Sequence, residues 1–219
     1  MTNNYNQDQD NQNNQNQGKF IVFEGIDGSG SSTQAQLLYD YCIANNRSAV
    51  LSPEPTSGKI GKLLREFLVG NDYFRDRDLY DQQMAYLFTA DRHYHLYNKI
   101  DGVKTLTQKN NHVITTRYYF SSLAYNAKNE QEYQFVSLLN QQFPPPDFLI
   151  YCDIPVDVAL ERIERRSTKE IYETKDKLIQ VSNNFNRILE NYSHSYLKVD
   201  ATLSPEEIHQ QILEYIGVV

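Results

Sequence analysis

The sequence predicts an α/β domain in which a five-stranded parallel sheet carries helices on both of its faces. Three observations lead to this prediction. Short apolar runs alternate along the chain with longer segments in which apolar residues recur at helical spacing. The first apolar run, Lys19–Glu24, leads directly into a glycine-rich turn, as a buried parallel strand does in such folds. A length of 219 residues suits one domain with a sizeable core.

Each element has its own local signal. Strands are expected at the short apolar runs, over Lys19–Glu24, Ser48–Leu51, His112–Thr115, Asp147–Cys152 and Ser195–Val199. Helices are expected at the amphipathic segments, over Ser32–Asn45, Ile60–Val69, Asp78–Ile100, Ser121–Ala127, Glu130–Gln142, Val156–Arg166 and Lys175–Tyr192. A last helix begins after Ser204, because Pro205 and Glu207 complete a capping-box pattern with a first-turn proline. Alternating strands and helices imply a parallel sheet.

The first 18 residues differ in composition from the rest. Met1–Gly18 consists almost entirely of Asn, Gln and Asp, so it has too little apolar surface to offset the entropy of ordering. It lacks the apolar stretch of a signal peptide and the arginine-rich pattern of a transit peptide. We therefore expect a disordered tail over residues 1–18 and one domain over residues 19–219.

Net charge, hydropathy and cysteine spacing argue against a nucleic-acid coat protein, a membrane-spanning protein and a cysteine metal site. A net charge of −7 argues against a surface that coats nucleic acid. No apolar run approaches the roughly 18 residues that a membrane-spanning helix needs. Cys42 and Cys152 lack metal-ligand spacing, and we expect them as buried thiols in a reducing cytoplasm.

Residues 25–32 have the spacing of a phosphate-binding loop without its lysine. Gly25 and Gly30 occupy the glycine positions of G-x-x-x-x-G-K-[ST], Ser32 occupies the hydroxyl position, and Ser31 stands where the lysine belongs. Backbone N–H groups and the head of the next helix can still cradle phosphates, and the Ser32 hydroxyl would hold Mg²⁺. The alternative is an ordinary glycine-rich turn. The predicted ATP-binding residues are Gly25, Ile26, Asp27, Gly28, Ser29, Gly30, Ser31, Ser32 and Thr33.

Six segments, in the same order along the chain, resemble the thymidylate kinase family. They are Phe23–Gly30 with Ser32-Thr33-Gln34, Glu54-Pro55-Thr56 with Gly61–Leu64, Phe88–Arg92 with His95, Arg117-Tyr118 with Ser121–Tyr125, Pro146-Asp147 with Asp153-Ile154-Pro155, and Arg162, Arg165 and Arg166 before Glu170–Glu173. The resemblance extends from residue 19 to residue 217. It implies a P-loop kinase fold with a mobile lid, phosphoryl transfer from ATP to dTMP with Mg²⁺, and a homodimer, to which a helix carrying Leu87 could contribute.

Two arginines and an aromatic ring are the main candidates for binding the acceptor. Phe88 and Arg92 share one helix face, where a ring can stack on a base and a guanidinium can donate to a carbonyl edge. Arg117 follows the carboxyl end of a strand, where open α/β sheets bind ligands, and a guanidinium suits a monophosphate. The resemblance assigns thymine to the first pair and the acceptor phosphate to Arg117.

Other readings of these residues stay open. Phe88 could be a core residue, Arg92 could form a surface salt bridge with Asp91 or with a partner elsewhere, and Arg117 could form an ion pair at the sheet end. The resemblance adds Asp27 as a sugar contact, with a turn-forming role as the alternative. Further acceptor-side candidates are Glu54, which could instead aid Mg²⁺ or be solvated, and Ser121 and Tyr125, which could serve in capping and packing.

A run of arginines, Arg162, Arg165 and Arg166, lies where the family has its lid. The interior of the phosphate loop has no arginine, and in family members of that kind a lid arginine supplies the cation. Arg165 and Arg166 are therefore predicted to act in catalysis together with Arg117. The alternative is a solvated run that complements a helix dipole, and the sequence does not decide which arginine points inward.

Two positions depart from the family pattern. Ser31 replaces the lysine of the phosphate loop, and Thr116 replaces the aspartate of the Asp-Arg-Tyr segment. A unit charge about 4 Å from a phosphate is worth on the order of 4 kcal/mol at an effective dielectric near 20, or roughly a thousandfold in rate. Three functions follow: a dTMP kinase, slowed by these losses; a nucleotide-binding pseudo-kinase; or a kinase for another pyrimidine monophosphate such as dUMP or dCMP.

Overall fold

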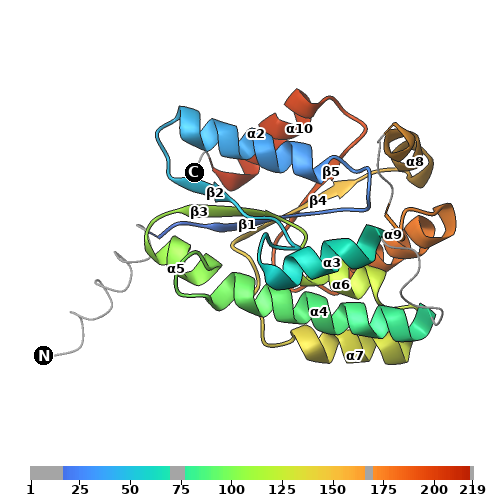
Figure 1. Cartoon of the computed structure of the whole chain (residues 1–219). Coiled ribbons are helices and arrows are strands. Elements are labelled where there is room, and N and C mark those ends of the chain that lie inside the picture. The colour runs from blue at the N-terminus through green and yellow to red at the C-terminus, as the bar shows by residue number, and fades with distance from the viewer. Residues whose placement is uncertain (1–16, 70–76, 166–169, 218–219) are drawn as a thin grey trace, which may run out of the picture.

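The computed structural model describes residues 17–69, 77–165 and 170–217, and the core of the protein is a parallel sheet (Figure 1). Its strand order is β2-β3-β1-β4-β5, and every neighbouring pair is parallel. The expected five-stranded parallel sheet is therefore confirmed. The strands are β1 (Phe20–Glu24), β2 (Ala49–Leu51), β3 (His112–Thr116), β4 (Phe148–Asp153) and β5 (Leu197–Asp200).

Helices cover both faces of this sheet. Figure 1 shows α2 and α10 on one face and α4, α6, α7 and α9 on the other. The helices are α2 (Ser31–Ala44), α3 (Lys59–Val69), α4 (Arg77–Tyr97), α5 (Val103–Gln108), α6 (Tyr119–Tyr125), α7 (Glu130–Asn140), α8 (Val156–Glu164), α9 (Lys175–Glu190) and α10 (Pro205–Ile216). The central strand β1 is buried along its whole length, because both of its faces pack against helices.

The capping box predicted at the last helix is present. The Glu207 N–H donates to Ser204 Oγ at 3.3 Å, and the Ser204 N–H donates to Glu207 Oε2 at 3.0 Å. By contrast, α5 was not predicted, because six residues are too few for a helical period to register. Helix α4 ends at Tyr97 rather than Ile100, since Asn98 Oδ1 accepts the N–H groups of Ile100 and Asp101 at 3.0 and 2.9 Å.

Two predicted segments fall largely outside the described residues. Residues 1–16 of the predicted tail are among these, whereas Gly18 donates its N–H to the Thr107 carbonyl at 3.0 Å. Residues 166–169 of the predicted lid are also outside them. Cys42 and Cys152 are buried free thiols, as expected, and burial raises the pKa of Cys152 to about 12. No helix in the described part of the chain is long and apolar enough to cross a bilayer.

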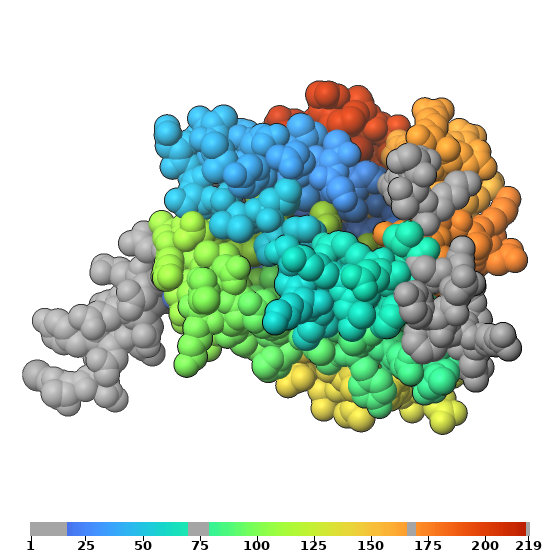
Figure 2. All heavy atoms as spheres, in the orientation of Figure 1, coloured from blue at the N-terminus to red at the C-terminus, as the bar shows by residue number. Residues whose placement is uncertain are grey.

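The carboxyl ends of three strands meet at one edge of the sheet. Phe23 of β1 is in register with Thr116 of β3, and Glu24 is in register with Tyr151 of β4. Open parallel sheets bind their ligands at this edge. A hollow opens there between α2 and α3 in the space-filling view (Figure 2).

Candidate active site

A cavity of about 400 Å³ lies at this edge, and most of the predicted site residues line it. The predicted residues that line it are Ile26, Asp27, Gly28, Gly30, Ser31, Ser32, Thr33, Glu54, Phe88, Arg92, Arg117, Ser121 and Tyr125. Thr116, which departs from the family pattern, lines it too. Gly25 and Ser29 are buried in the loop behind this wall.

The phosphate loop keeps its shape because glycines occupy its left-handed positions. Gly28 has φ +84°, and a Cβ there would lie 2.5 Å from the Ala159 carbonyl oxygen of α8. Gly30 has φ +87° and stands at the N-cap of α2, where no described side chain caps the helix. The N–H groups of Ser31, Ser32 and Thr33 therefore have no partner within the helix, and their residues line the cavity. Such a helix head binds anions through backbone N–H groups and the helix dipole.

One arginine of the predicted lid run lies against the phosphate loop. Arg162 donates to the Gly28 carbonyl at 3.4 Å and to the Ala201 carbonyl at 2.9 Å. Arg165 follows the end of α8, is exposed and is not among the residues that line the cavity. Arg166 lies outside the described residues. Among these three arginines, the observed contact with the loop is therefore made by Arg162, and the catalytic roles of Arg165 and Arg166 stay predictions.

At the end of β3, Arg117 forms an ion pair with Asp27. Arg117 also donates to Ser121 Oγ at 3.2 Å and lies 4.9 Å from the centre of the Tyr125 ring. The Tyr125 hydroxyl donates to Asp27 Oδ2 at 2.8 Å and accepts the Asp27 N–H at 3.1 Å. Burial alone would lower the pKa of Arg117, but Asp27 and Tyr125 hold it well above its usual range. The ion pair foreseen as an alternative thus exists, and it lies inside the cavity.

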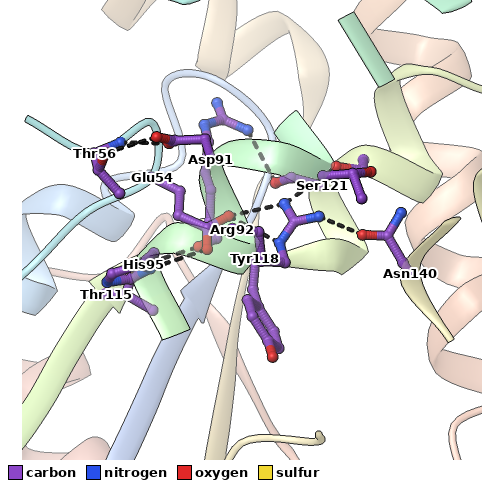
Figure 3. A network of polar contacts seen from close by, with 12 residues as sticks. Glu54, Thr56, Asp91, Arg92, His95, Thr115, Tyr118, Ser121 and Asn140 are labelled. Carbon is purple, nitrogen blue, oxygen red and sulfur yellow. Dashed lines mark hydrogen bonds and ion pairs between the residues drawn. The ribbon is translucent and has the colours of Figure 1, made fainter. Parts of the chain in front are cut away.

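Arg92 is fully buried on α4 and is held from three sides (Figure 3). Its Nε and Nη2 pair with Glu54 Oε2 at 2.9 and 2.8 Å. Its Nη1 donates to Asn140 Oδ1, and its Nη2 also donates to Ser122 Oγ at 3.2 Å. One Nη1 hydrogen of its five N–H groups is left for a ligand. Half-buried Phe88 lies one turn earlier on α4 and also lines the cavity.

Two of the alternatives to a binding role do not describe this network: the salt bridge of Arg92 is with Glu54 and not with Asp91, and Glu54 is not solvated. The Asp91 carboxylate accepts the N–H and hydroxyl of Thr56 at 2.7 and 2.6 Å. Glu54 is 4 % exposed, and its Oε1 lies 3.0 Å from His95 Nδ1. Its Oε2 pairs with Arg92, so both of its oxygens have partners within the protein.

Sequence reasoning missed the residues that support these side chains. Asp91 and His95 were named only as neighbours of Arg92; their helical spacing on α4 was a usable signal for the contacts that they make with Thr56 and Glu54. Asn140 gave no signal, because it contacts Arg92 across 48 positions of sequence. Glu24 was predicted as the end of a strand and as part of the segment that resembles the family's phosphate loop, without a role of its own; it is buried and binds the N-terminal turn of α6.

Comparisons with known proteins agree with this geometry. A family model described as thymidylate kinase matches residues 23–212. A probable thymidylate kinase of Methanococcus aeolicus is 34 % identical over 203 residues, covering 90 % of this chain and 94 % of that protein. A putative thymidylate kinase of Treponema pallidum is also 34 % identical over 203 residues, with the same coverage.

A solved structure shows the same architecture. Thymidylate kinase from Candida albicans superimposes with a TM-score of 0.73 at 27 % identity, over 92 % of each chain. The family model covers well over half of this sequence, and the archaeal and bacterial relatives match it almost from end to end. This chain therefore belongs to the thymidylate kinase family.

Proposed function

We propose that this protein transfers the γ-phosphoryl group of ATP to dTMP, which yields ADP and dTDP. The observation that carries the proposal is that one cavity is lined by the bare head of α2, by Arg117 and by Arg92. The helix head and phosphate loop would hold the donor phosphates, and Arg117 would hold the acceptor phosphate. Phosphoryl transfer depends mainly on such positioning and on charge stabilisation.

The base contacts favour a thymine or uracil edge over a cytosine edge. Phe88 would stack on the ring, and the remaining Nη1 hydrogen of Arg92 would donate to the carbonyl O4. Ser122 Oγ, beside Arg92, can accept the adjacent N3–H. Cytosine presents an amino group in place of O4, so a donor would face a donor. We therefore propose that dTMP and dUMP bind better than dCMP.

For the sugar, we propose Asp27 together with Tyr125. The Asp27 carboxylate is fixed at the cavity wall by Arg117 and by the Tyr125 hydroxyl. A carboxylate held in this way can still accept a hydrogen bond from a sugar hydroxyl.

We propose that Mg²⁺ enters as a complex with ATP. The described residues contain no group of three or more His, Cys, Asp or Glu side chains that could hold a metal alone. This fits Mg²⁺, which keeps several waters and binds through substrate phosphates with few protein ligands. The Ser32 hydroxyl lines the cavity at the helix head and would be one ligand. When bound, the ion neutralises charge on the transferred group.

The lost lysine leaves the pseudo-kinase as a specific alternative. Neither Lys59 nor Lys62 of α3 is among the residues that line the cavity, and neither is Arg162. We propose Arg162 as the first candidate for the replacement cation because it already contacts the loop. Arg162→Ala should lower turnover, and the variants Arg165→Ala and Arg166→Ala measure what the rest of the run contributes.

The decisive experiment is an ADP-release assay with dTMP, dUMP and dCMP. The unmodified chain and the double variant Ser31→Lys/Thr116→Asp are run side by side. Turnover of dTMP by the unmodified chain supports the proposal, and a gain in the double variant measures the cost of the two departures. Silence of the unmodified chain, with activity in the variant, would establish the pseudo-kinase.

A second candidate function is a kinase of wider pyrimidine range. The Candida albicans relative is described as having broad substrate specificity. A single methyl group is worth only about 1–3 kcal/mol in a hydrophobic pocket. Similar kcat/KM values for dTMP and dUMP would favour this candidate.

We also propose a homodimer and a cytoplasmic location. Helix α4 exposes a row of large side chains, Leu79, Tyr86, Tyr94 and Tyr97, which a second copy could cover. Analytical ultracentrifugation of the protein and of a Tyr86→Glu/Tyr94→Glu variant tests the dimer. The two buried free thiols suit a reducing compartment, and fractionation of the source cells tests the location.

A further inference from the structure

Glu24 is a buried carboxylate for which the proposed chemistry gives no direct role. It ends β1 immediately before the phosphate loop and is 1 % exposed. Its Oε1 accepts the N–H of Tyr118 at 2.7 Å and the N–H of Ser121 at 3.2 Å, and its Oε2 accepts the Ser121 hydroxyl at 2.6 Å. One side chain of β1 therefore fixes the turn that begins α6.

This turn contains Arg117 in a strained conformation. Arg117 has φ +69°, in the left-handed region that residues with a Cβ rarely adopt. Such a conformation is unfavourable and persists only where the surroundings impose it. Here β1 imposes it from both sides: the Arg117 N–H donates to the Phe23 carbonyl at 2.9 Å, and the next N–H, of Tyr118, donates to Glu24.

A second link joins Glu24 to the guanidinium group itself. Ser121 Oγ donates to Glu24 Oε2 and accepts from Arg117 Nη1 at 3.2 Å. The carboxylate thus sets the direction of the serine hydroxyl, and that hydroxyl presents its lone pair to the arginine.

We propose that Glu24 is a positioning residue for the acceptor phosphate, because its ionised carboxylate holds the strained turn and the Ser121 hydroxyl that together aim Arg117 into the cavity. The proposal rests on the proposed function only in taking Arg117 as the residue that binds the phosphate of dTMP.

The groups around Glu24 leave it free to respond to pH. Arg117 and Tyr119 face it from the turn and from α6, and Tyr151 and Cys152 face it from β4. Burial raises the pKa of both tyrosines and of the thiol, so they stay neutral near pH 7, and the arginine stays charged. Burial also raises the pKa of Glu24 to about 7, against the hydrogen bonds of Ser121 and the charge of Arg117.

Protonation of Glu24 would reverse the donor and acceptor in its hydrogen bond with the Ser121 hydroxyl. A proton on Oε2 must be donated to Ser121 Oγ, so the hydroxyl can no longer donate to Glu24. The charge that attracts Arg117 is lost at the same time. Glu24→Gln imitates this state, because the amide keeps one oxygen for the two backbone N–H groups and turns an NH₂ towards Ser121.

The test is calorimetric binding of dTMP and of ATP to the full chain and to Glu24→Gln, at about pH 8.5 and about pH 5.5. Glu206→Gln, an exposed exchange of the same kind on α10, is the matched control. We expect dTMP to bind Glu24→Gln roughly tenfold more weakly at the higher pH, as loss of a hydrogen bond to a charged group implies. At the lower pH the two proteins should bind dTMP about equally, and ATP affinity should change less than about twofold throughout. The dTMP phosphate itself titrates near pH 6. This affects both proteins equally, so it cancels when their dissociation constants are compared at the same pH.

Each of the other outcomes would overturn one specific part of the proposal. The deciding quantity is the dissociation constant of dTMP for Glu24→Gln divided by that for the unmodified protein. A value near one at the higher pH, or a value that does not change with pH, would refute the positioning role. An equal loss of ATP affinity would make Glu24 a support of the whole loop instead. If the unmodified chain does not bind dTMP, the proposed function fails. The role of Glu24 is then decided by hydrogen exchange over residues 117–122, which should accelerate in Glu24→Gln only at the higher pH.

If Glu24→Gln does not fold, a second variant tests the same proposal. Ser121→Ala removes the link between Glu24 and the guanidinium while leaving the backbone contacts. It should weaken dTMP binding more at the higher pH than at the lower. The same loss at both would refute the link.

Discussion

The two halves of the cavity are built in different ways. The donor half consists of backbone: a glycine loop and the bare first turn of α2, with Arg162 against the loop from outside. The proposed acceptor half consists of paired charges: Arg117 on Asp27, a partly buried pair, and Arg92 on Glu54, a buried pair. Triphosphates are alike in all nucleotides and can be held by N–H groups alone, whereas one base and one monophosphate must be recognised by directed side chains. The departures from the family pattern, Ser31 and Thr116, leave the charge pairs of the acceptor half intact.

The largest expected effect is at Arg117. Arg117→Ala should lower kcat/KM for dTMP by roughly a hundredfold to a thousandfold, because it removes the proposed charge-assisted hydrogen bonds to the acceptor phosphate, each worth about 1.5–3 kcal/mol. The dissociation constant of ATP should stay unchanged, since the donor half lacks this side chain. Steady-state kinetics and calorimetry test the two parts. Equal losses on both sides would show that the halves are not independent.

The next largest effect is on the free energy of unfolding when the buried Arg92–Glu54 pair is broken. Arg92→Met should lower the free energy of unfolding by about 3–5 kcal/mol, because it leaves the Glu54 charge buried without its partner. Lys175→Met breaks the exposed pair with Asp157 and should have no measurable effect. Urea unfolding of both variants gives the comparison. A small change in Arg92→Met would mean that His95 suffices to hold Glu54.

Glu24 should make stability depend on pH. Its pKa is about 7 in the folded protein against 4.5 for the ordinary group, so between these values the folded state binds a proton that the unfolded state has lost. Stability from this group is therefore full below about pH 4.5 and falls as pH rises to about 7, by on the order of 3 kcal/mol. Relative to the unmodified protein, Glu24→Gln should lose less stability over that interval. Parallel unfolding curves at all pH values would contradict the shift.

The smallest effect should appear in the donor half. Gly28→Ala places a Cβ 2.5 Å from the Ala159 carbonyl oxygen at φ +84°, and ATP affinity should fall about tenfold while dTMP affinity holds. Gly217→Ala is the matched control, because it has φ +76° with nothing within 4 Å of the new Cβ. The control carries the backbone strain without the collision. Similar affinity losses in both variants would assign the effect to general destabilisation, because Gly217 is the C-cap of α10 and does not line the cavity.

Local patterns foresaw the sheet, most helices and the wall of the cavity. The loop Gly25–Ser32, the capping box at Ser204 and the pair Phe88 and Arg92 each depend on neighbours within about one helical turn, so their spacing shows in the sequence. Short α5 escaped because helical periodicity needs more than six residues to show. Arg162, not Arg165, contacts the loop. Helix α8 ends at Glu164, so Arg162 lies on the helix and donates to the Gly28 carbonyl, whereas Arg165 lies beyond the last helical residue.

The sequence by itself determined the fold class, the family and the residue types at the cavity. Only the tertiary structure decided how those residues are charged and aimed. Glu54 became a buried partner of Arg92, and Glu24 became the support of Arg117, through contacts that span 38 and 94 positions. Burial and pairing of charges depend on which chain segments pack together, so a local sequence pattern does not specify the partner of a charge.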